Sequence, residues 1–99
     1  MINHKQAVLK AFDDLDASLK ILIHALQKND GDAAHEAVTV LLHQSIMAFG
    51  VDSPIMRQFF PVFERIKQHI DALTLTDALG QTELFKGQIV QIVSSFRGG

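Results

Sequence analysis

The chain has 99 residues, of which 47% are hydrophobic and 20% are charged, and its formal net charge is −2 at pH 7. This length allows one domain with one core, and this composition is typical of a globular chain rather than a disordered one. The absence of cysteine excludes disulfides and thiolate chemistry, and the acidic balance without a basic cluster argues against a nucleic-acid partner.

The N-terminal segment MINHKQAVLKAFDDLD is interrupted by charged residues and lacks the apolar core of a signal peptide. No stretch of about 18 uncharged apolar residues occurs, so no transmembrane helix is predicted. We therefore expect a cytoplasmic protein with a single domain over residues 1–99.

Helical periodicity begins in the first stretch of the chain, at about residues 4–28. Asn3 is the expected N-cap, because Gln6 follows it at the spacing of a capping box. The apolar residues are separated by four and three positions in turn, which is the heptad pattern of a bundle helix. They are Val8, Phe12, Leu15, Leu19, Leu22 and Leu26. Asp16 and Lys20, one turn apart, are expected to form an ion pair on the solvent side.

The second helix is expected at about residues 33–49, after a polar break at 28–32. Asp32 is its expected N-cap, and Gly50 is suited to the position just after its end. Its apolar stripe is less regular, because Ser45 interrupts it. The stripe comprises Val38, Leu41, Leu42, Ile46 and Phe49.

The third helix is expected to start after Asp52 or Ser53, with Pro54 at the first helical position. Its apolar spacing keeps its phase past Pro61, which falls on the opposite side. The seam comprises Met56, Phe59, Phe63, Ile66, Ile70 and Leu73. Pro61 costs about 3 kcal/mol, whereas burial of the seam contributes roughly 12 kcal/mol. We therefore predict one helix that bends at Pro61. Phe60 flanks the seam and is either a packing residue or a partner contact.

The fourth helix is expected to start near Thr74 or Thr76, where Thr74 and Asp77 form a weak variant of the capping box. Its seam comprises Ala78, Thr82, Phe85, Ile89, Ile92 and Phe96. Together the four stretches predict an all-α, antiparallel (up-down-up-down) four-helix bundle.

Gly80, Leu84 and Gly87 lie opposite the seam of the fourth helix. Glycine inside a helix costs about 1 kcal/mol relative to alanine, so two glycines on an exposed face require a reason. One interpretation is a groove in which another helix docks. The other is a weak helix start, with the stable part beginning at Thr82 as a cap.

The histidines are the main candidates for chemistry. His35 and His43 are separated by about 12 Å along a helix axis, which is too far to share one metal ion, and the i,i+4 spacing of helical metal sites does not occur. We therefore expect no metal and no cofactor.

The segment GDAAHEAVTVLLHQSIMAFG places His43 in the middle of a bundle helix. In this respect it resembles histidine phosphotransfer domains, which pass phosphoryl groups between response regulators. The resemblance implies that His43 is a phosphoacceptor. Those domains usually carry a lysine and then a glycine just after the histidine, whereas this chain has Ile46 and Met47 at those places.

The sequence contains no glycine-rich phosphate loop, serine-nucleophile elbow or nucleotide motif, so we expect no enzyme. In size, helix content and charge it is similar to small bacterial secretion or flagellar-export chaperones and adaptors. The leading hypothesis is a non-catalytic protein-binding module that contacts its partner through Gly80, Leu84, Gly87 and Phe60. The alternatives are a phosphotransfer domain that uses His43 and an obligate homodimer whose second subunit covers the fourth helix.

Overall fold

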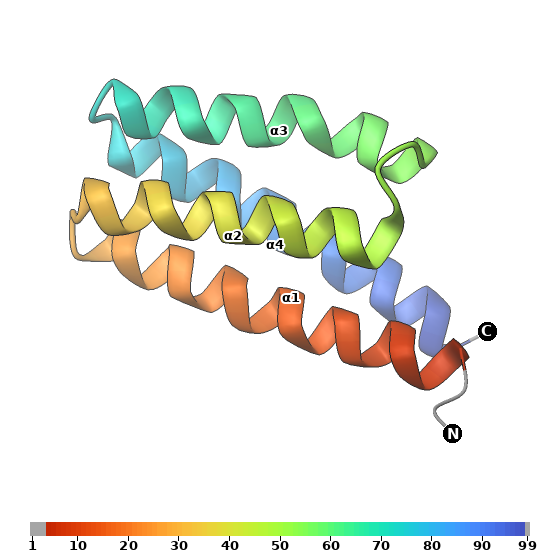
Figure 1. The fold of residues 1–99 in the computed structure, drawn as a ribbon. Helices are drawn as coiled ribbons and strands as arrows, with labels where there is room; N and C mark the ends of the chain where they lie inside the picture. The colour runs from red at the N-terminus through yellow and green to blue at the C-terminus, as the bar shows by residue number, and fades with distance from the viewer. Residues whose placement is uncertain (1–3, 99) are drawn as a thin grey trace.

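The computed structural model describes the backbone of residues 4–98 and the side chains of residues 6–96. This part of the chain forms four helices and no strand: α1 (His4–Gln27), α2 (Gly31–Phe49), α3 (Pro54–Asp71) and α4 (Leu75–Gly98). Each helix packs against the next, and α4 also packs against α1. Successive helices run in opposite directions (Figure 1). The predicted antiparallel four-helix bundle is confirmed, while the predicted N-cap Asn3 lies outside the described residues.

The junction between α2 and α3 forms as the sequence predicts. Gly50 follows α2 with φ of 90°, a backbone conformation that favours glycine, and its N–H donates to the Ile46 carbonyl at 2.8 Å. Ser53 is the N-cap of α3, and its hydroxyl accepts a hydrogen bond from the Met56 N–H at 3.1 Å. Pro54 occupies the first turn, where its missing N–H leaves no bond unmade.

The predicted start of α2 is wrong, because Asp30 rather than Asp32 is its N-cap. The Asp30 carboxylate accepts a hydrogen bond from the Ala33 N–H at 3.1 Å. The Asp30 N–H donates to the Ala25 carbonyl at 3.0 Å, and Asn29 has φ of 58°, as in a Schellman motif. Asp30 thus ends one helix and starts the next, so the connection is shorter than the polar break indicates.

The predicted place of Leu73 in the α3 seam is also wrong. α3 ends at Asp71, and Leu73 adopts φ of 61° with 76% of its surface exposed. The Thr74 N–H donates to the His69 carbonyl at 2.8 Å, which completes a second Schellman motif. Thr74 precedes α4 as predicted, but its hydroxyl donates to the same carbonyl of α3. The next residue, Leu75, enters the core instead of Leu73.

The seams predicted for α1, α3 and α4 form most of the core. Their buried members are Phe12, Leu15, Leu19, Leu22 and Leu26 on α1, Met56, Phe59, Phe63, Ile66 and Ile70 on α3, and Ala78, Thr82, Phe85 and Ile89 on α4. Seam residues near the chain termini, such as Val8, Ile92 and Phe96, are half-buried. The predicted ion pair is present, with Lys20 Nζ 3.1 Å from Asp16 Oδ2.

The core-facing side of α2 differs from the prediction. Ser45 does not interrupt the buried face but belongs to it, because its hydroxyl donates to the Leu41 carbonyl at 2.9 Å and is thereby satisfied. The buried residues of α2 are Ala34, Ala37, Val38, Leu41 and Ser45. Leu42, Ile46 and Phe49 are only half-buried at its edge. The small side chains of Ala34, Ala37 and Ser45 suit a close approach of α2 to α1, the helix with which it makes its most extensive contact.

Six of the seven phenylalanines form a continuous cluster of ring contacts that reaches all four helices. In order of contact the rings are Phe96, Phe12, Phe49, Phe59, Phe85 and Phe63, with neighbouring centroids 4.8 to 5.8 Å apart. Most of these contacts are edge to face, the geometry that the aromatic quadrupole favours. We call these residues the phenylalanine cluster.

α3 continues through Pro61, and Pro61 is exposed, as predicted. Phe59 and Phe63, on either side of it, are buried in the phenylalanine cluster. Burial of the seam therefore outweighs the backbone hydrogen bond that proline cannot donate. The bend at Pro61 stays a prediction.

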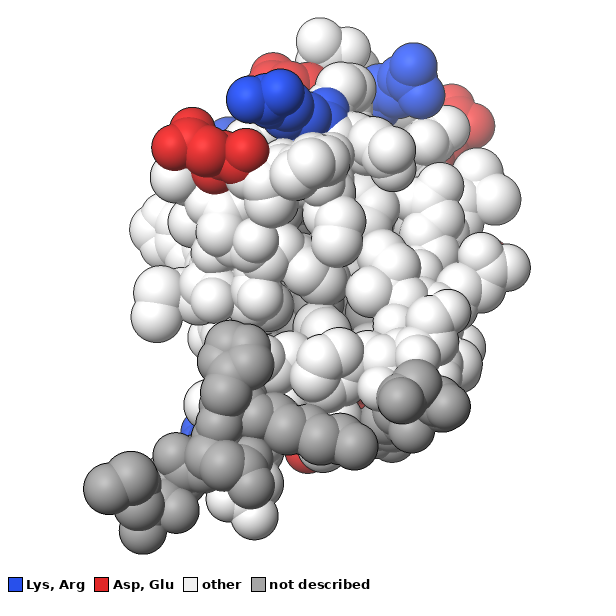
Figure 2. Space-filling model, turned by 90° about the vertical axis from the view of Figure 1, so that its right-hand side faces the viewer, with Lys and Arg blue, Asp and Glu red and all other residues white. Residues whose placement is uncertain are grey.

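Charged side chains are unevenly spread over the end of the bundle that carries the α2–α3 connection (Figure 2). In the view onto the end that carries the α2–α3 connection, they gather over α3, and much of the other described surface is uncharged (Figure 2). Arg57, Glu64 and Arg65 are among the exposed charged residues of α3. Met47 and Val51, near the connection, are 81% and 55% exposed. None of the helices, over their described residues, combines the length and apolar character needed to cross a membrane.

We predict that Phe85→Ala lowers the free energy of unfolding by about 3–5 kcal/mol, because it leaves a cavity and removes two ring contacts. Urea denaturation followed by circular dichroism measures this change. Phe60→Ala is the matched control, and it should cost clearly less because Phe60 is half-buried. Equal losses of unfolding free energy in the two variants would show that the phenylalanine cluster contributes no more to stability than a half-buried ring outside it.

We predict that Pro61→Ala raises the free energy of unfolding or leaves it unchanged, with a gain of up to about 3 kcal/mol. Alanine supplies an N–H for the Arg57 carbonyl and removes the steric clash of the ring. Pro54→Ala is the control, since proline is favoured at that position and no gain is expected there. A large loss of stability in Pro61→Ala would show that the bundle requires the proline.

Candidate functional site

The predicted docking residues of α4 lie on one exposed face. Gly80, Leu84 and Gly87 are all exposed, with Leu84 66% exposed. A Cβ atom added at either glycine would meet no atom within 4 Å. Phe85 and Ile89 are buried on the opposite side, which confirms the predicted phase of the helix. We call Gly80, Leu84 and Gly87 the glycine stripe.

The predicted cap at Thr82 is wrong, whereas the low stability of the helix before Thr82, the alternative interpretation of the glycines, stays a prediction. α4 is continuous from Leu75. Thr82 is fully buried, and its hydroxyl donates to the Ala78 carbonyl at 2.8 Å, a bond that threonine makes inside a helix rather than at its N-cap. The glycines are therefore interior residues of the helix, where each costs about 1 kcal/mol relative to alanine.

Phe60, the other predicted contact residue, is on α3 and not on the glycine stripe. It is half-buried and packs against the core. Its packing role is thus established, while its contact with a partner stays a prediction.

His35 and His43 are both exposed on α2. The hydroxyl of Thr39, which lies between them, donates to the His35 carbonyl at 3.1 Å. Met47, which occupies the place of the phosphotransfer glycine, is 81% exposed one turn beyond His43. The role of His43 as a phosphoacceptor remains a hypothesis. Among the described residues, no three or more His, Cys, Asp or Glu side chains are grouped so that they could hold a metal ion.

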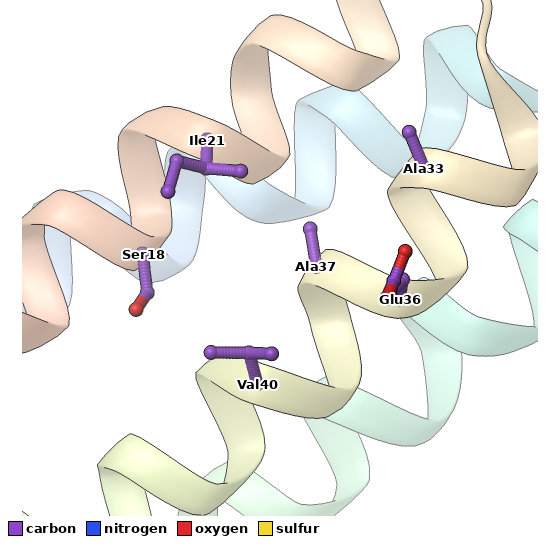
Figure 3. A pocket seen from close by; sticks show the side chains of 6 residues that line it. All are labelled: Ser18, Ile21, Ala33, Glu36, Ala37 and Val40. Atoms are coloured by element: carbon purple, nitrogen blue, oxygen red, sulfur yellow. The ribbon is translucent and has the colours of Figure 1, made fainter.

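A groove between α1 and α2 is a feature that the heptad seams do not reveal. Ile21 of α1 and Val40 of α2 flank it, and the small side chains of Ser18, Ala33 and Ala37 leave it open (Figure 3). Ile21 and Val40 are 62% and 45% exposed. The available signal in the sequence is that these two apolar residues lie outside the seams.

A second groove, of about 290 Å³, lies between α1 and α4. It is lined by Phe12, Asp13 and Asp16 of α1 and by Ile89, Val90, Val93 and Ser94 of α4. Phe12 and Ile89 are buried, whereas Val90 is 52% exposed. Both carboxylates belong to α1, and α4 has no charged residue between positions 87 and 96. We call this feature the α1/α4 groove.

Comparisons of this chain with protein-family models, curated proteins and solved structures found no match.

We predict that the protein binds no zinc with sub-micromolar affinity in calorimetry, because His35 and His43 lie too far apart along α2. Thr39→His is a matched control that places an imidazole one turn from both histidines, at the spacing of helical metal sites. This variant should bind zinc. Tight zinc binding by the unaltered protein would contradict the prediction.

Proposed function

We propose that this protein is a non-catalytic protein-binding module that docks an uncharged, apolar face of a partner protein's helix against the outer side of α4. The observation that carries the proposal is the glycine stripe. Two glycines share an exposed helix face, with the exposed Leu84 between them and open space beside both.

The cost of the glycines has no compensation within the monomer. A packing reason would require a neighbouring group close to the glycine backbone, and an added Cβ meets nothing within 4 Å at Gly80 or Gly87. Without side chains at these positions, a second helix can approach α4 closely and gain dispersion contacts along its backbone. The glycines are separated by two turns and therefore lie on the same face.

The composition of α4 supports a partner with an apolar contact face. Leu84 offers a large apolar side chain between the two glycines. Glu83 and Lys86 lie near it in the sequence, whereas residues 87–96 carry no charge that docking would have to desolvate. In size, helix content and charge the chain is similar to small bacterial adaptors and export chaperones, and we propose a role of that kind in the cytoplasm. In the homodimer alternative, a second copy of this chain covers the same stripe.

We predict that Gly87→Leu abolishes partner binding without unfolding the domain, because the new side chain fills the space that the partner's backbone occupies. The thermal midpoint should stay unchanged or rise, since leucine exceeds glycine in helix propensity by somewhat under 1 kcal/mol. Affinity capture from the native cell, followed by mass spectrometry, compares this variant with the unaltered protein. Gln68→Leu, which adds leucine at an exposed position of α3, is the matched control.

A protein captured by the unaltered chain and by Gln68→Leu, but not by Gly87→Leu, supports the proposal. Capture that Gly87→Leu leaves intact contradicts docking on the glycine stripe. Analytical ultracentrifugation of the same variants tests the homodimer. Self-association of the unaltered protein that Gly87→Leu abolishes would identify a second copy as the occupant. A lowered thermal midpoint would mean that Gly87 packs inside the bundle.

A further inference from the structure

We propose that the α1/α4 groove is a second docking site, and that it binds an amphipathic helix of a partner protein that carries lysine or arginine along one edge. This inference comes from the walls of the groove and does not depend on the glycine stripe.

The α4 wall provides an apolar contact surface. Val90 is 52% exposed, and Val93, less than one turn further, is half-buried. Phe12 and Ile89 are buried beneath them, so the base of the groove is apolar as well. An amphipathic helix lies in such a groove with apolar residues spaced by three or four positions.

The α1 wall provides the charge. Asp13 and Asp16 line the groove on this side alone, and the facing part of α4, residues 87–96, contains no charged residue. Asp13 also has an interaction within the protein. Asp16 is paired with Lys20 at 3.1 Å, and both of these side chains are substantially exposed. Such i,i+4 surface pairs are weak, so the carboxylate remains available to an additional base.

The two different walls determine the partner's chemistry and orientation. A partner helix must turn its basic edge toward α1 and its apolar edge toward α4, because charge complementarity exists on one side only. An acidic helix would be repelled by Asp13 and Asp16. Nucleic acid, with its phosphate charges, would be repelled for the same reason.

The test uses a displayed library of amphipathic helical peptides with a fixed apolar face and randomised edges, selected on the full-length protein. The selected peptides should carry lysine or arginine along one edge, and their affinity should fall as salt concentration rises. The double variant Asp13→Asn/Asp16→Asn should bind them about tenfold more weakly. Val90→Lys should abolish binding, because it places a positive charge in the apolar wall, where the apolar face of the basic peptide would have to pack.

The double variant Glu64→Gln/Asp71→Asn is the matched control, because it removes the same charge from exposed positions of α3. It should bind the peptides as tightly as the unaltered protein. If both double variants bind the peptides equally weakly, only the net charge of the protein matters, and the proposal is overturned. Peptides without a basic edge, or peptides insensitive to Val90→Lys, would also overturn it. If the unaltered protein dimerises, and both Val90→Lys and Asp13→Asn/Asp16→Asn abolish the dimer, the occupant of the groove is a second copy of this chain.

Discussion

The phenylalanine cluster is the interaction on which the arrangement of this bundle depends. Aliphatic side chains in the heptad seams help to drive the four helices together, but they pack in many rotational settings. Edge-to-face ring contacts are directional. Phe12, Phe49, Phe59 and Phe85, one from each helix, therefore fix how each helix is turned about its own axis. With Phe85 held toward the core, the opposite face of α4 is fixed toward solvent, and the glycine stripe lies on that face.

The α1–α2 and α3–α4 connections are organised by backbone geometry. Asn29 and Leu73 both adopt a left-handed conformation in Schellman motifs, so α1–α2 and α3–α4 are joined by the same kind of turn. Asparagine tolerates this conformation well, whereas leucine does so at a cost. The turn also leaves Leu73 exposed and gives its place in the core to Leu75. Short connections of this kind require neighbouring helices to be antiparallel, which agrees with the observed topology.

The surfaces proposed for binding follow from how charge is distributed around the bundle. α3 carries exposed charges of both signs, while the C-terminal part of α4 carries none between residues 87 and 96. An uncharged helix face is inexpensive to desolvate and suits close helix packing. Where this face meets the aspartates of α1, the surface becomes apolar on one side and acidic on the other. The two proposed sites therefore select partners by different means, the glycine stripe by shape and the α1/α4 groove by charge.

The sequence by itself determined the four helices, the core-facing sides of α1, α3 and α4, the uninterrupted path through Pro61 and the exposure of Gly80 and Gly87. These features depend on periodicity and capping within a single helix, which are local properties. The tertiary structure alone decided that Ser45 faces the core, and the hydrogen bond of its hydroxyl to the Leu41 carbonyl lets it be buried there. It alone decided the order of the ring contacts and the position of the α1/α4 groove. A groove depends on the offset and rotation of two helices relative to each other, and no periodicity within one helix contains that information.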